Sequence, residues 1–295
     1  MNKKYNLQLF ANETITTDIE PGISVDFASK LTNNIRTLQR ILAIDELDAL
    51  PEGNAIPIYA YNQKNTPAQV AEGVTIPLTE VERTLVKTIT MTLKKYRKQS
   101  TAELIQKVGR TRAINETDNV ILSNVQKDIK TDFFTMLATG SGTATGVGVQ
   151  KALADAWGKV VKGFDDIDAT PVFFVSSDDV ADYLGGASIS MQTAFGWNYI
   201  ENFLGLGDTF VTPALTKGTA YATAKENLRG AYVPANNGAV ADSFGLNGDG
   251  TGLIGITHSV ETSNASIETL MMSCVVFYPE IVSKVYEVTI TSAGA

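Results

Sequence analysis

The feature that most constrains this chain is a stretch, residues 50–98, in which proline and glycine interrupt strand-like runs. The clearest runs are residues 55–61 and 84–93, and a third strand-like piece covers residues 70–76. β-Branched residues and partial alternation of apolar and polar side chains are typical of strands. We therefore predict two long antiparallel strands joined by a tip near residues 62–69. A hairpin of this length is only marginally stable alone in water, so it must lie on another surface, and an adjacent subunit is the natural candidate.

Apolar residues recur with a helical period on both sides of the predicted hairpin. A spacing of three or four predicts amphipathic helices at residues 24–44 and 111–138. At 1.5 Å per residue the second helix is about 40 Å long. Between the hairpin and this helix, Ser100 as N-cap and Glu103 fit a capping box, and the short helix that they begin should end at Gly109.

A glycine-rich run, residues 140–148, follows the long helix and predicts a flexible linker between two regions. It is not a phosphate-binding loop, because neither G-x-G-x-x-G nor G-K-[ST] can be drawn there. The second region mixes a helix at residues 149–160 with a buried strand at 171–175. Two long strands, residues 267–278 and 281–290, close the chain. Helices and strands together predict an α+β fold.

Few residues in the sequence could support catalysis. Cys274 is the one cysteine and lies in an apolar run, so a buried core residue is expected and no disulfide can form within the chain. His258 is the one histidine, which excludes a His-rich metal site, and no G-x-S-x-G elbow accompanies it. The acids at 165–168 and at Asp178 and Asp179 are interpreted as turn and helix-cap residues. We expect no enzyme, no catalytic residue, no metal and no cofactor.

Charge is unevenly distributed along the chain. The net charge is −8, yet residues 83–112 contain nine basic residues and one acid, Glu103, so this segment carries +8 and the rest −16. Such polarity predicts that the basic segment of one copy meets an acidic surface of another. The first alternative is that the basic segment is a solvent-exposed face without a partner. A nucleic-acid-binding patch is a weaker interpretation, because the chain as a whole is acidic. The candidate inter-subunit contacts are Arg83, Lys87, Lys94, Lys95, Arg97, Lys98 and Glu72.

The sequence contains no recognisable signal peptide and no membrane-spanning segment. The apolar stretch near the start is short and interrupted by Asn6 and Gln8. No window reaches the roughly 18 apolar residues of a membrane span. We therefore expect a protein that is made in the cytoplasm and stays soluble there until it assembles.

The order of elements, with three sequence stretches, resembles a known family. The stretches are residues 71–79 (AEGVTIPLT), 90–98 (TMTLKKYRK) and 206–221 (LGDTFVTPALTKGTAY). Together they resemble the major capsid proteins of tailed phages with the HK97-type fold, and are similar to a subfamily from phages of Gram-positive bacteria. The resemblance covers nearly the whole chain. It depends on the order of the elements, because no single motif is as specific as a catalytic signature.

The resemblance implies a division of the chain into parts. These are an N-terminal arm (1–30), an amphipathic helix joining the arm to the loop (31–47), an extended β-hairpin loop (48–98), a peripheral domain with the spine helix and glycine-rich linker (99–148), an axial domain (149–265) and closing strands that return to the peripheral domain (266–295). Some members of the family that this chain resembles form Lys–Asn cross-links between subunits. Lys64 lies near the predicted tip, but no asparagine in the sequence matches the partner, so we do not expect this cross-link.

The resemblance also implies a function. The chain would self-assemble, as pentamers and hexamers, into the icosahedral head of a virion built in the host bacterial cytoplasm. Its partners would be a separate scaffolding protein, a portal protein, and packaged double-stranded DNA contacted without sequence specificity. An encapsulin-like nanocompartment shell is the first alternative, and a soluble enzyme is the second.

Overall fold

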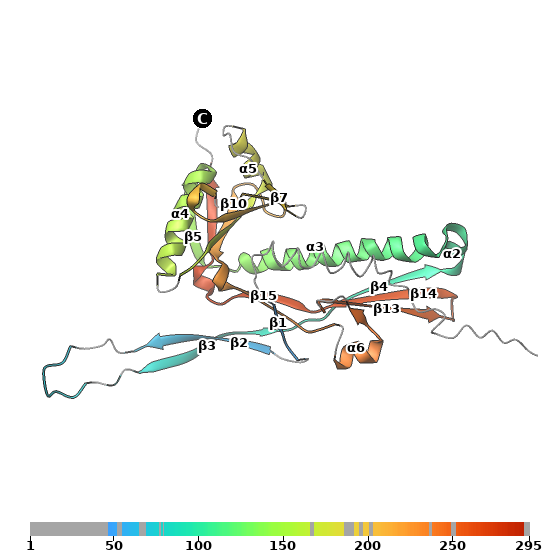
Figure 1. Ribbon diagram of the computed structural model, residues 1–295, viewed down its shortest axis with the longest axis horizontal. Helices are drawn as coiled ribbons and strands as arrows, with labels where there is room; N and C mark the ends of the chain where they lie inside the picture. Colours follow the sequence, from blue (N-terminus) through green and yellow to red (C-terminus); the bar gives the residue numbers. More distant parts are fainter. Residues whose placement is uncertain are drawn as a thin grey trace, which may run out of the picture.

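The computed structural model describes residues 47–51, 55–64, 69–76, 78, 80–165, 168–185, 192–194, 197–200, 203–235, 238–248 and 252–291. The expected arm and the helix expected at 24–44 lie outside these residues. Figure 1 shows a long helix lying over a sheet, a second domain standing at one end of this layer, and a hairpin that projects from the body. The mixture of helices and sheets confirms the predicted α+β class.

The projecting hairpin consists of β2 (Ala55–Gln63) and β3 (Val81–Thr90), which pair antiparallel. The register shifts between Ile58 and Tyr59, which leaves Val86 as an extra residue on β3, and such a bulge increases the local twist. The prediction of a strand at residues 70–76 is wrong. This segment forms an exposed turn, with Val74 N–H donating to Ala71 O at 3.1 Å, because no partner strand lies beside it among the described residues.

The spine layer is a sheet with a helix along it. The sheet order is β12 (Asn247–Gly248), β13 (Ile254–Glu261), β14 (Ser266–Ser273), β4 (Lys94–Thr101). Helix α3 (Thr117–Leu137) confirms the long helix predicted at residues 111–138, except that its first turn, Thr111–Glu116, is π-helical. Helix α3 lies along the sheet (Figure 1). Its apolar stripe, which includes Val125, Ile129 and Phe133, is buried in one core cluster with Ile254, Ile256 and Met271 of the sheet.

The short helix before α3 begins one residue later than predicted. Helix α2 (Ala102–Val108) has Thr101 as its N-cap, whose hydroxyl accepts from Leu104 N at 3.4 Å. Ser100 is instead part of β4 and donates its hydroxyl to Ala113 O at 2.9 Å. The helix ends at Gly109, as predicted, where φ is +84°.

The second domain is built on one larger sheet. Its strand order is β5 (Gly142–Val147), β16 (Tyr286–Thr291), β10 (Thr219–Ala224), β6 (Pro171–Ser176), β9 (Asp208–Thr212), β8 (Trp197–Ile200), β7 (Gln192–Ala194). Helix α4 (Gly148–Gly163) packs on this sheet through Leu153, Ala156 and Val160, and α5 (Ser177–Leu184) follows β6. This α4 confirms the helix predicted after the glycine-rich run.

The glycine-rich run itself is not the flexible linker that was predicted. Its residues form β5, which pairs parallel with β16. A Cβ added at Gly140 would lie 2.6 Å from Val285 O, and one at Gly146 would lie 2.4 Å from Ala152 N. These distances are too short for any side chain, so the glycines allow close packing of β5 against its neighbours.

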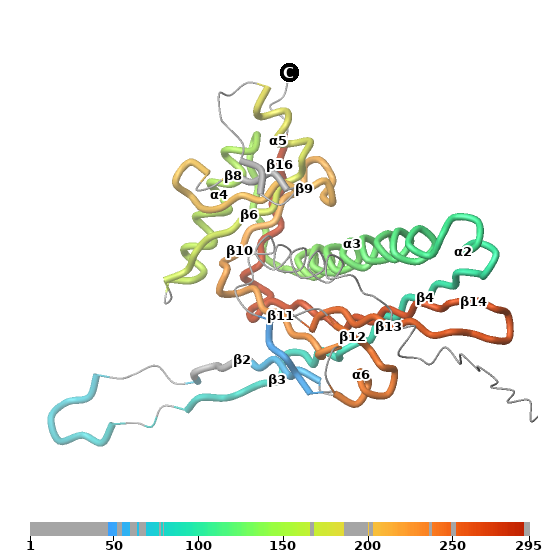
Figure 2. Tube along the Cα trace, turned by 45° about the vertical axis from the view of Figure 1, so that its right-hand side comes forward, coloured from blue at the N-terminus to red at the C-terminus, as the bar shows by residue number. Residues whose placement is uncertain are grey.

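The closing strands connect the two domains. The run predicted as one strand, residues 267–278, breaks at Cys274 into β14 and β15 (Val275–Pro279), because β15 pairs with β11 (Leu228–Tyr232) in a different sheet. Strand β1 (Leu47–Ala49) pairs with the other edge of β11. The run predicted at 281–290 becomes strand only at Tyr286, after a 3-10 turn at Val282–Lys284. Figure 2 shows these C-terminal residues, in red, passing under α3 and then rising into the second domain.

The hydrophobic core is continuous between the spine layer and the second domain. Phe133 of α3 contacts Phe277 of β15 with ring centroids 5.5 Å apart. The same ring contacts Phe174 of β6, in the second domain, at 5.2 Å. All three side chains are buried. The two domains are therefore held by shared packing, which makes the body a firm base for the hairpin.

Candidate assembly surfaces

The hairpin exposes large apolar side chains along β3. Leu85 and Val86 are each 56% exposed, and Val81 is exposed to a similar degree. Alternate residues of a strand point to opposite faces, so in a hairpin lying on its own body one of these faces would be covered. In Figure 1 the hairpin instead stands away from the body along most of its length. Both the strands and the connection beyond them are therefore available for contact.

The hairpin tip is also apolar and exposed. Val74, Ile76 and Leu78 occupy every second position, and Leu78 is 89% exposed. Glu72, one of the predicted contact residues, is exposed in the same segment. Sequence reasoning placed a strand here and missed the apolar tip. The available signal was an alternating apolar row inside a segment rich in proline and glycine.

A shallow apolar groove lies at the opposite end of the hairpin, where the chain leaves β1. Its volume is about 380 Å³, and its lining residues are Ala49, Leu50, Pro51, Val233, Pro234, Gly238 and Ala239. Main-chain hydrogen bonds hold its walls: Leu50 N–H donates to Tyr232 O at 2.9 Å, and Val233 N–H donates to Cys274 O at 3.0 Å. Helix α6 (Ala239–Phe244) begins at its rim. Sequence reasoning did not find this groove.

Three of the predicted contact cations are matched by acids of the same chain. Lys94 Nζ lies 2.5 Å from Asp132 Oδ2, and Arg97 Nε donates to Glu268 at 3.1 Å. Lys98 Nζ lies 2.6 Å from Asp118 Oδ1. Their charge serves first to hold β4 against α3 and β14, so they are weaker candidates for contact with another copy than the sequence indicated.

The remaining predicted contact cations lie on exposed surfaces. Arg83 lies over the Tyr59 ring, with its guanidinium carbon 3.4 Å from the ring centroid, and it stiffens the hairpin by a cation–π contact. Lys87 on β3 and Lys95 on β4 are exposed. Arg83 and Lys87 lie on β3 and Glu72 lies in the connection beyond the strands, whereas Lys94, Lys95, Arg97 and Lys98 lie on β4. Their contact with a sister copy remains a prediction.

A buried ionic cluster joins β4, α3 and β13. Asp118 accepts hydrogen bonds from Lys98 at 2.6 Å and from His258 Nε2 at 2.8 Å, since an ionised carboxylate can only accept. Lys98 also bonds Ile114 O at 3.1 Å and the Thr117 hydroxyl. Burial alone would raise the pKa of Asp118, but the hydrogen bonds from His258 and Lys98 outweigh it and lower the pKa. Sequence spacing could not reveal this cluster, because its members are up to 160 positions apart (Lys98 to His258).

The imidazole of His258 uses one of its two ring nitrogens in this cluster. His258 Nδ1 is buried and has no hydrogen-bond partner among the described residues, so the imidazole is not paired with a nucleophilic hydroxyl. Within the described residues, no group of three His, Cys, Asp or Glu side chains could hold a metal ion. Asp118, bonded to Lys98 of β4 and His258 of β13, holds these two strands to α3.

The cysteine and the paired acids considered in the sequence analysis lie in the core and at a helix start. Cys274 is buried, as expected, and burial raises the pKa of its thiol. Asp178 and Asp179 lie in the first turn of α5, as expected, although the N-cap is Ser176, whose hydroxyl accepts from Asp178 N at 3.3 Å. Asp179 accepts from Gly218 N at 2.8 Å. Both acids thus stabilise a helix start and a neighbouring turn.

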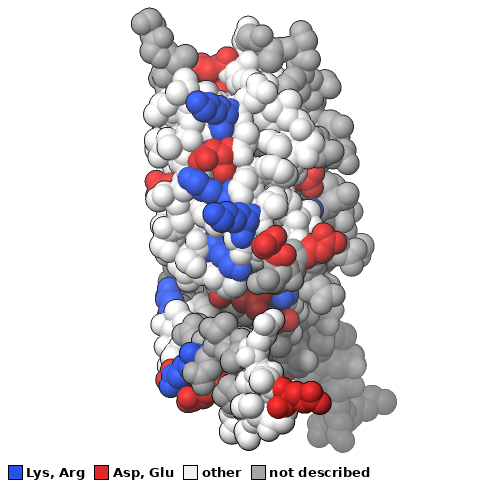
Figure 3. All heavy atoms as spheres, turned by 90° about the vertical axis from the view of Figure 1, so that its left-hand side faces the viewer, with Lys and Arg blue, Asp and Glu red and all other residues white. Residues whose placement is uncertain are grey.

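A basic surface on the second domain was not foreseen. Helix α4 carries Lys151, Lys159 and Lys162 but only one acid, Asp155, which pairs with Lys159 at 2.9 Å. Figure 3, which faces the end of the molecule that bears α4 and the hairpin, shows Lys and Arg side chains in a column over the upper half. Trp157 and Val161 are partly exposed on the same helix. This mixed basic and apolar face lies on the side toward which the hairpin projects.

The described helices contain no segment long and apolar enough to cross a membrane.

Comparison with protein-family models finds no match, and comparison with curated proteins finds none either. Solved structures do match. The SrpI encapsulin complex from Synechococcus elongatus PCC 7942 is similar over 88% of this chain and 91% of its own, at 11% identity and a TM-score of 0.57. The mature capsid of bacteriophage PhiM1 is similar over 84% and 85%, at 9% identity and 0.56.

A third match has the longest coverage of the three. Mycobacterium phage Patience is similar over 92% of this chain and 88% of its own, at 9% identity and a TM-score of 0.55. The fold is therefore that of phage capsids and encapsulins, the HK97-type fold, as the sequence resemblance implied.

Proposed function

We propose that this chain is the major capsid protein of a tailed phage and self-assembles into an icosahedral head that encloses double-stranded DNA. One observation carries the proposal. A hairpin built on a rigid body exposes large apolar side chains at Val81, Leu85 and Val86, and again at its tip. The HK97-type fold supports the same conclusion, because the similar solved structures are a phage capsid and an encapsulin.

The physical argument is that the hairpin needs a second copy. A pair of strands alone in water is marginal, and Val81, Leu85 and Val86 leave this pair with large apolar side chains exposed to water. A sister copy that covers the hairpin removes apolar area from water at about 25 cal/mol per Å². Symmetry repeats the contact at every subunit, so many modest interfaces give a stable shell.

A phage capsid and an encapsulin-like shell, the first alternative, differ in what they enclose. An encapsulin-like shell would enclose an enzyme in place of DNA, and the encapsulin from Synechococcus elongatus matches this fold as well as the phage capsids do. We favour the capsid because residues 71–79, 90–98 and 206–221 resemble phage capsid proteins, of the subfamily from phages of Gram-positive bacteria. The partners would then be a scaffolding protein, a portal protein and DNA, and the location would be the virion after assembly in the host cytoplasm.

The experiment is sedimentation and electron microscopy of the purified protein, with and without a co-expressed scaffolding protein. We expect closed particles from the parent chain and a strong loss of particles from the double substitution Leu85→Ser with Val86→Ser. The matched control is Val120→Ser, because Val120 is 61% exposed on α3, outside the hairpin. A parent chain that stays a compact monomer at high concentration would refute the proposal. Particles that contain an enzyme and no nucleic acid would favour the encapsulin-like alternative.

A further inference from the structure

We propose that the free edge of strand β4 binds an extended, acidic segment of a separate partner protein, which adds to the spine sheet as a further strand. The inference goes beyond the proposed function, because that function concerns contacts between copies of this chain. The binding surface consists of the main-chain groups and the side chains of Lys95, Arg97 and Gln99.

Strand β4 lies at the edge of its sheet, and β14 is the strand that pairs with it among the described residues. Next to the last pair of this register, Ala102 N–H donates to Ala265 O at 3.0 Å. In an antiparallel ladder, residues that bond the neighbouring strand alternate with residues whose N–H and C=O groups point away from it. Counting back from Ala102, the even-numbered residues of β4 bond β14, so Lys95, Arg97 and Gln99 point their main-chain groups outward.

These outward main-chain groups are unpaired within the described part of the chain. No hydrogen bond joins the N–H or C=O groups of Lys95, Arg97 and Gln99 to another described residue. They recur at every second residue, which places them about 7 Å apart. Such a row of donors and acceptors is a template for an added strand, and strand addition to an exposed sheet edge is a common way of binding an extended peptide.

The second domain shows how this chain closes an edge strand. Strand β5 lies at the edge of the larger sheet, and helix α4 covers its main chain with two side chains. Asp155 accepts from Thr145 N–H at 3.2 Å, and Lys159 Nζ donates to Thr143 O at 2.9 Å. The outward main-chain groups of β4 have no such side chains over them among the described residues.

Strand β4 is held in place before any partner binds. Its alternate side chains face α3, where Lys94 Nζ lies 2.5 Å from Asp132 Oδ2 and the Tyr96 hydroxyl donates to Asp128 at 2.7 Å. A strand that is already ordered has less conformational freedom to lose on binding than a segment that must first fold. The edge is therefore preorganised for an incoming strand.

The exposed face of the edge selects an acidic partner. The side chains of Lys95, Arg97 and Gln99 are all exposed and point away from α3, because neighbouring residues of a strand point to opposite faces. Arg97 bonds Glu268 on its inner side and is still 67% exposed, and Lys95 has no acidic partner among the described residues. Since opposite charges across neighbouring strands are stabilising, acids at alternate positions of the added strand match this row.

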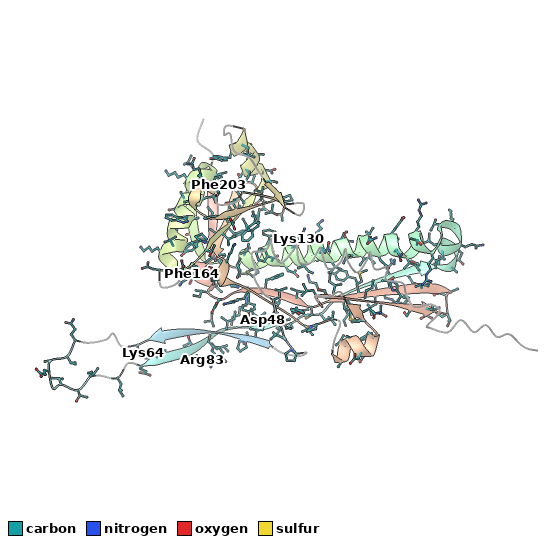
Figure 4. All side chains as sticks on the ribbon, viewed as in Figure 1. Asp48, Lys64, Arg83, Lys130, Phe164 and Phe203 are labelled. Atoms are coloured by element: carbon teal, nitrogen blue, oxygen red, sulfur yellow. The ribbon has the colours of Figure 1, made fainter. Side chains whose placement is uncertain are left out.

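A second copy of this chain fits the edge poorly. Two β4 strands side by side would place basic side chains of both copies next to one another, which is destabilising. On the projecting hairpin, β3 carries Arg83 and Lys87 against one acid, and β2 carries no acid. Figure 4 shows Lys64 and Arg83 on this hairpin. None of the described strands has acids at alternate positions, so the occupant that fits is a separate protein.

Hydrogen exchange at single-residue resolution tests the edge in the full-length, unassembled protein. The probe is a peptide as long as β4, eight residues, that alternates glutamate with threonine, and the control peptide has lysine in place of glutamate. Without peptide, the amides of Lys95, Arg97 and Gln99 should exchange fast and those of Tyr96 and Lys98 slowly. The glutamate peptide should slow the three outward amides several-fold, and the lysine peptide should leave them unchanged.

Substitutions at Gln99 test the main-chain contact separately from the side chain. Gln99→Pro removes an outward N–H group and keeps the ladder to β14, since proline is tolerated where an edge strand faces solvent. Gln99→Ala removes the same side chain and is the matched control. Fluorescence anisotropy with the labelled glutamate peptide should show binding several-fold weaker for Gln99→Pro and close to the parent for Gln99→Ala. Lys95→Glu, which reverses one charge and keeps every main-chain group, should also weaken binding several-fold and serves if Gln99→Pro does not fold.

The inference is overturned if the glutamate peptide does not bind the parent, or if it slows inward and outward amides alike. Equal binding by folded Gln99→Pro and Gln99→Ala, or unchanged binding by Lys95→Glu, would also overturn it. Exchange is then measured on assembled particles, where the outward amides should stay fast. Protection there without peptide would show that a sister copy covers the edge and would overturn the separate partner. A parent that forms no particles would count against the proposed function alone, because the peptide measurements use the unassembled chain.

Discussion

Two hairpins of nearly the same length behave in opposite ways in this molecule. The hairpin β13–β14 pairs eight residues of each strand, and β2–β3 pairs nine. Met271 of β14 is 1% exposed, whereas Leu85 of β3 is 56% exposed. Helix α3 covers one face of β13–β14 and β4 pairs with its edge, while β2–β3 projects beyond the body. Local structure is therefore alike in both, and the covering elements decide whether a hairpin becomes core or contact surface.

The same contrast appears in the ion pairs of the two regions. The Lys98–Asp118 pair beneath α3 leaves 16% and 4% of the side chains exposed. On the projecting hairpin, Lys64 pairs with Glu80 at 3.4 Å and with Glu82 at 3.2 Å, and all three side chains are about half exposed or more. A buried pair is costly to break because one charge is left without a partner, whereas an exposed pair contributes little.

The largest expected effect comes from removing the buried acid of the body. Asp118→Ala leaves Lys98 without its carboxylate partner, and we expect a loss of about 3–5 kcal/mol in the free energy of unfolding. Urea denaturation of the unassembled protein measures it. The matched control is Asp128→Ala, which removes the acceptor of the 2.7 Å hydrogen bond from Tyr96 at a less buried site. Equal losses for the two variants would contradict the special role given to the Asp118 cluster.

The next prediction compares the two hairpins directly. Met271→Ala creates a cavity in the core and should cost about 2–5 kcal/mol of unfolding free energy. Leu85→Ala should change it by less than about 0.5 kcal/mol in the unassembled protein, as surface substitutions do. Particle yield should show a strong effect for Leu85→Ala. If Leu85→Ala destabilised the isolated chain as much as Met271→Ala, the distinction between a buried hairpin β13–β14 and an exposed hairpin β2–β3 would be wrong.

The pH dependence of stability should come in part from the body cluster. The pKa of Asp118 is lowered in the folded protein, so its contribution is fully present above the unfolded value of about 3.9 and is lost as the pH falls through the folded value. Stability should therefore decrease below about pH 4. Burial raises the pKa of Asp179, which acts in the opposite direction.

A difference measurement isolates the Asp118 contribution to this pH dependence. Unfolding free energies of the parent and of Asp118→Asn are compared from neutral pH to pH 3. The gap between the two curves should narrow as the pH falls. A gap that stays constant would show that Asp118 does not titrate in this range.

The smallest expected effect lies on the projecting hairpin. Lys64→Ala removes two exposed ion pairs and should lower the unfolding free energy by only about 0–1 kcal/mol, less in high salt because exposed charges are screened. Thermal unfolding at low and high salt measures it, with Lys107→Ala, on exposed α2, as the control. A loss comparable to that of Asp118→Ala would mean that the hairpin is not the loosely held region described here.

Local patterns predicted most of the elements, and long-range packing explains the errors. The stripe that ends at Leu137 predicted α3, and Gly109 predicted the end of α2 correctly. The glycine-rich run was mistaken for a linker because glycine alone does not distinguish freedom from close packing. Ser100 was mistaken for an N-cap because its strand partner, Ile267, is 167 positions away. The predicted contact cations were identified by charge alone, and only the fold shows that Lys94, Arg97 and Lys98 face acids of their own chain.

The sequence by itself determined the long helix α3, the helix α4 and the paired strands of the proline- and glycine-rich stretch, because periodicity and backbone preference depend on near neighbours. Only the tertiary structure decided which hairpin is covered, that Lys98, Asp118 and His258 meet, and that residues 49–51 and 233–239 form one groove. These outcomes depend on strand pairing between residues far apart in the chain. Such pairing is set by the packing of the whole body, and no local pattern records it.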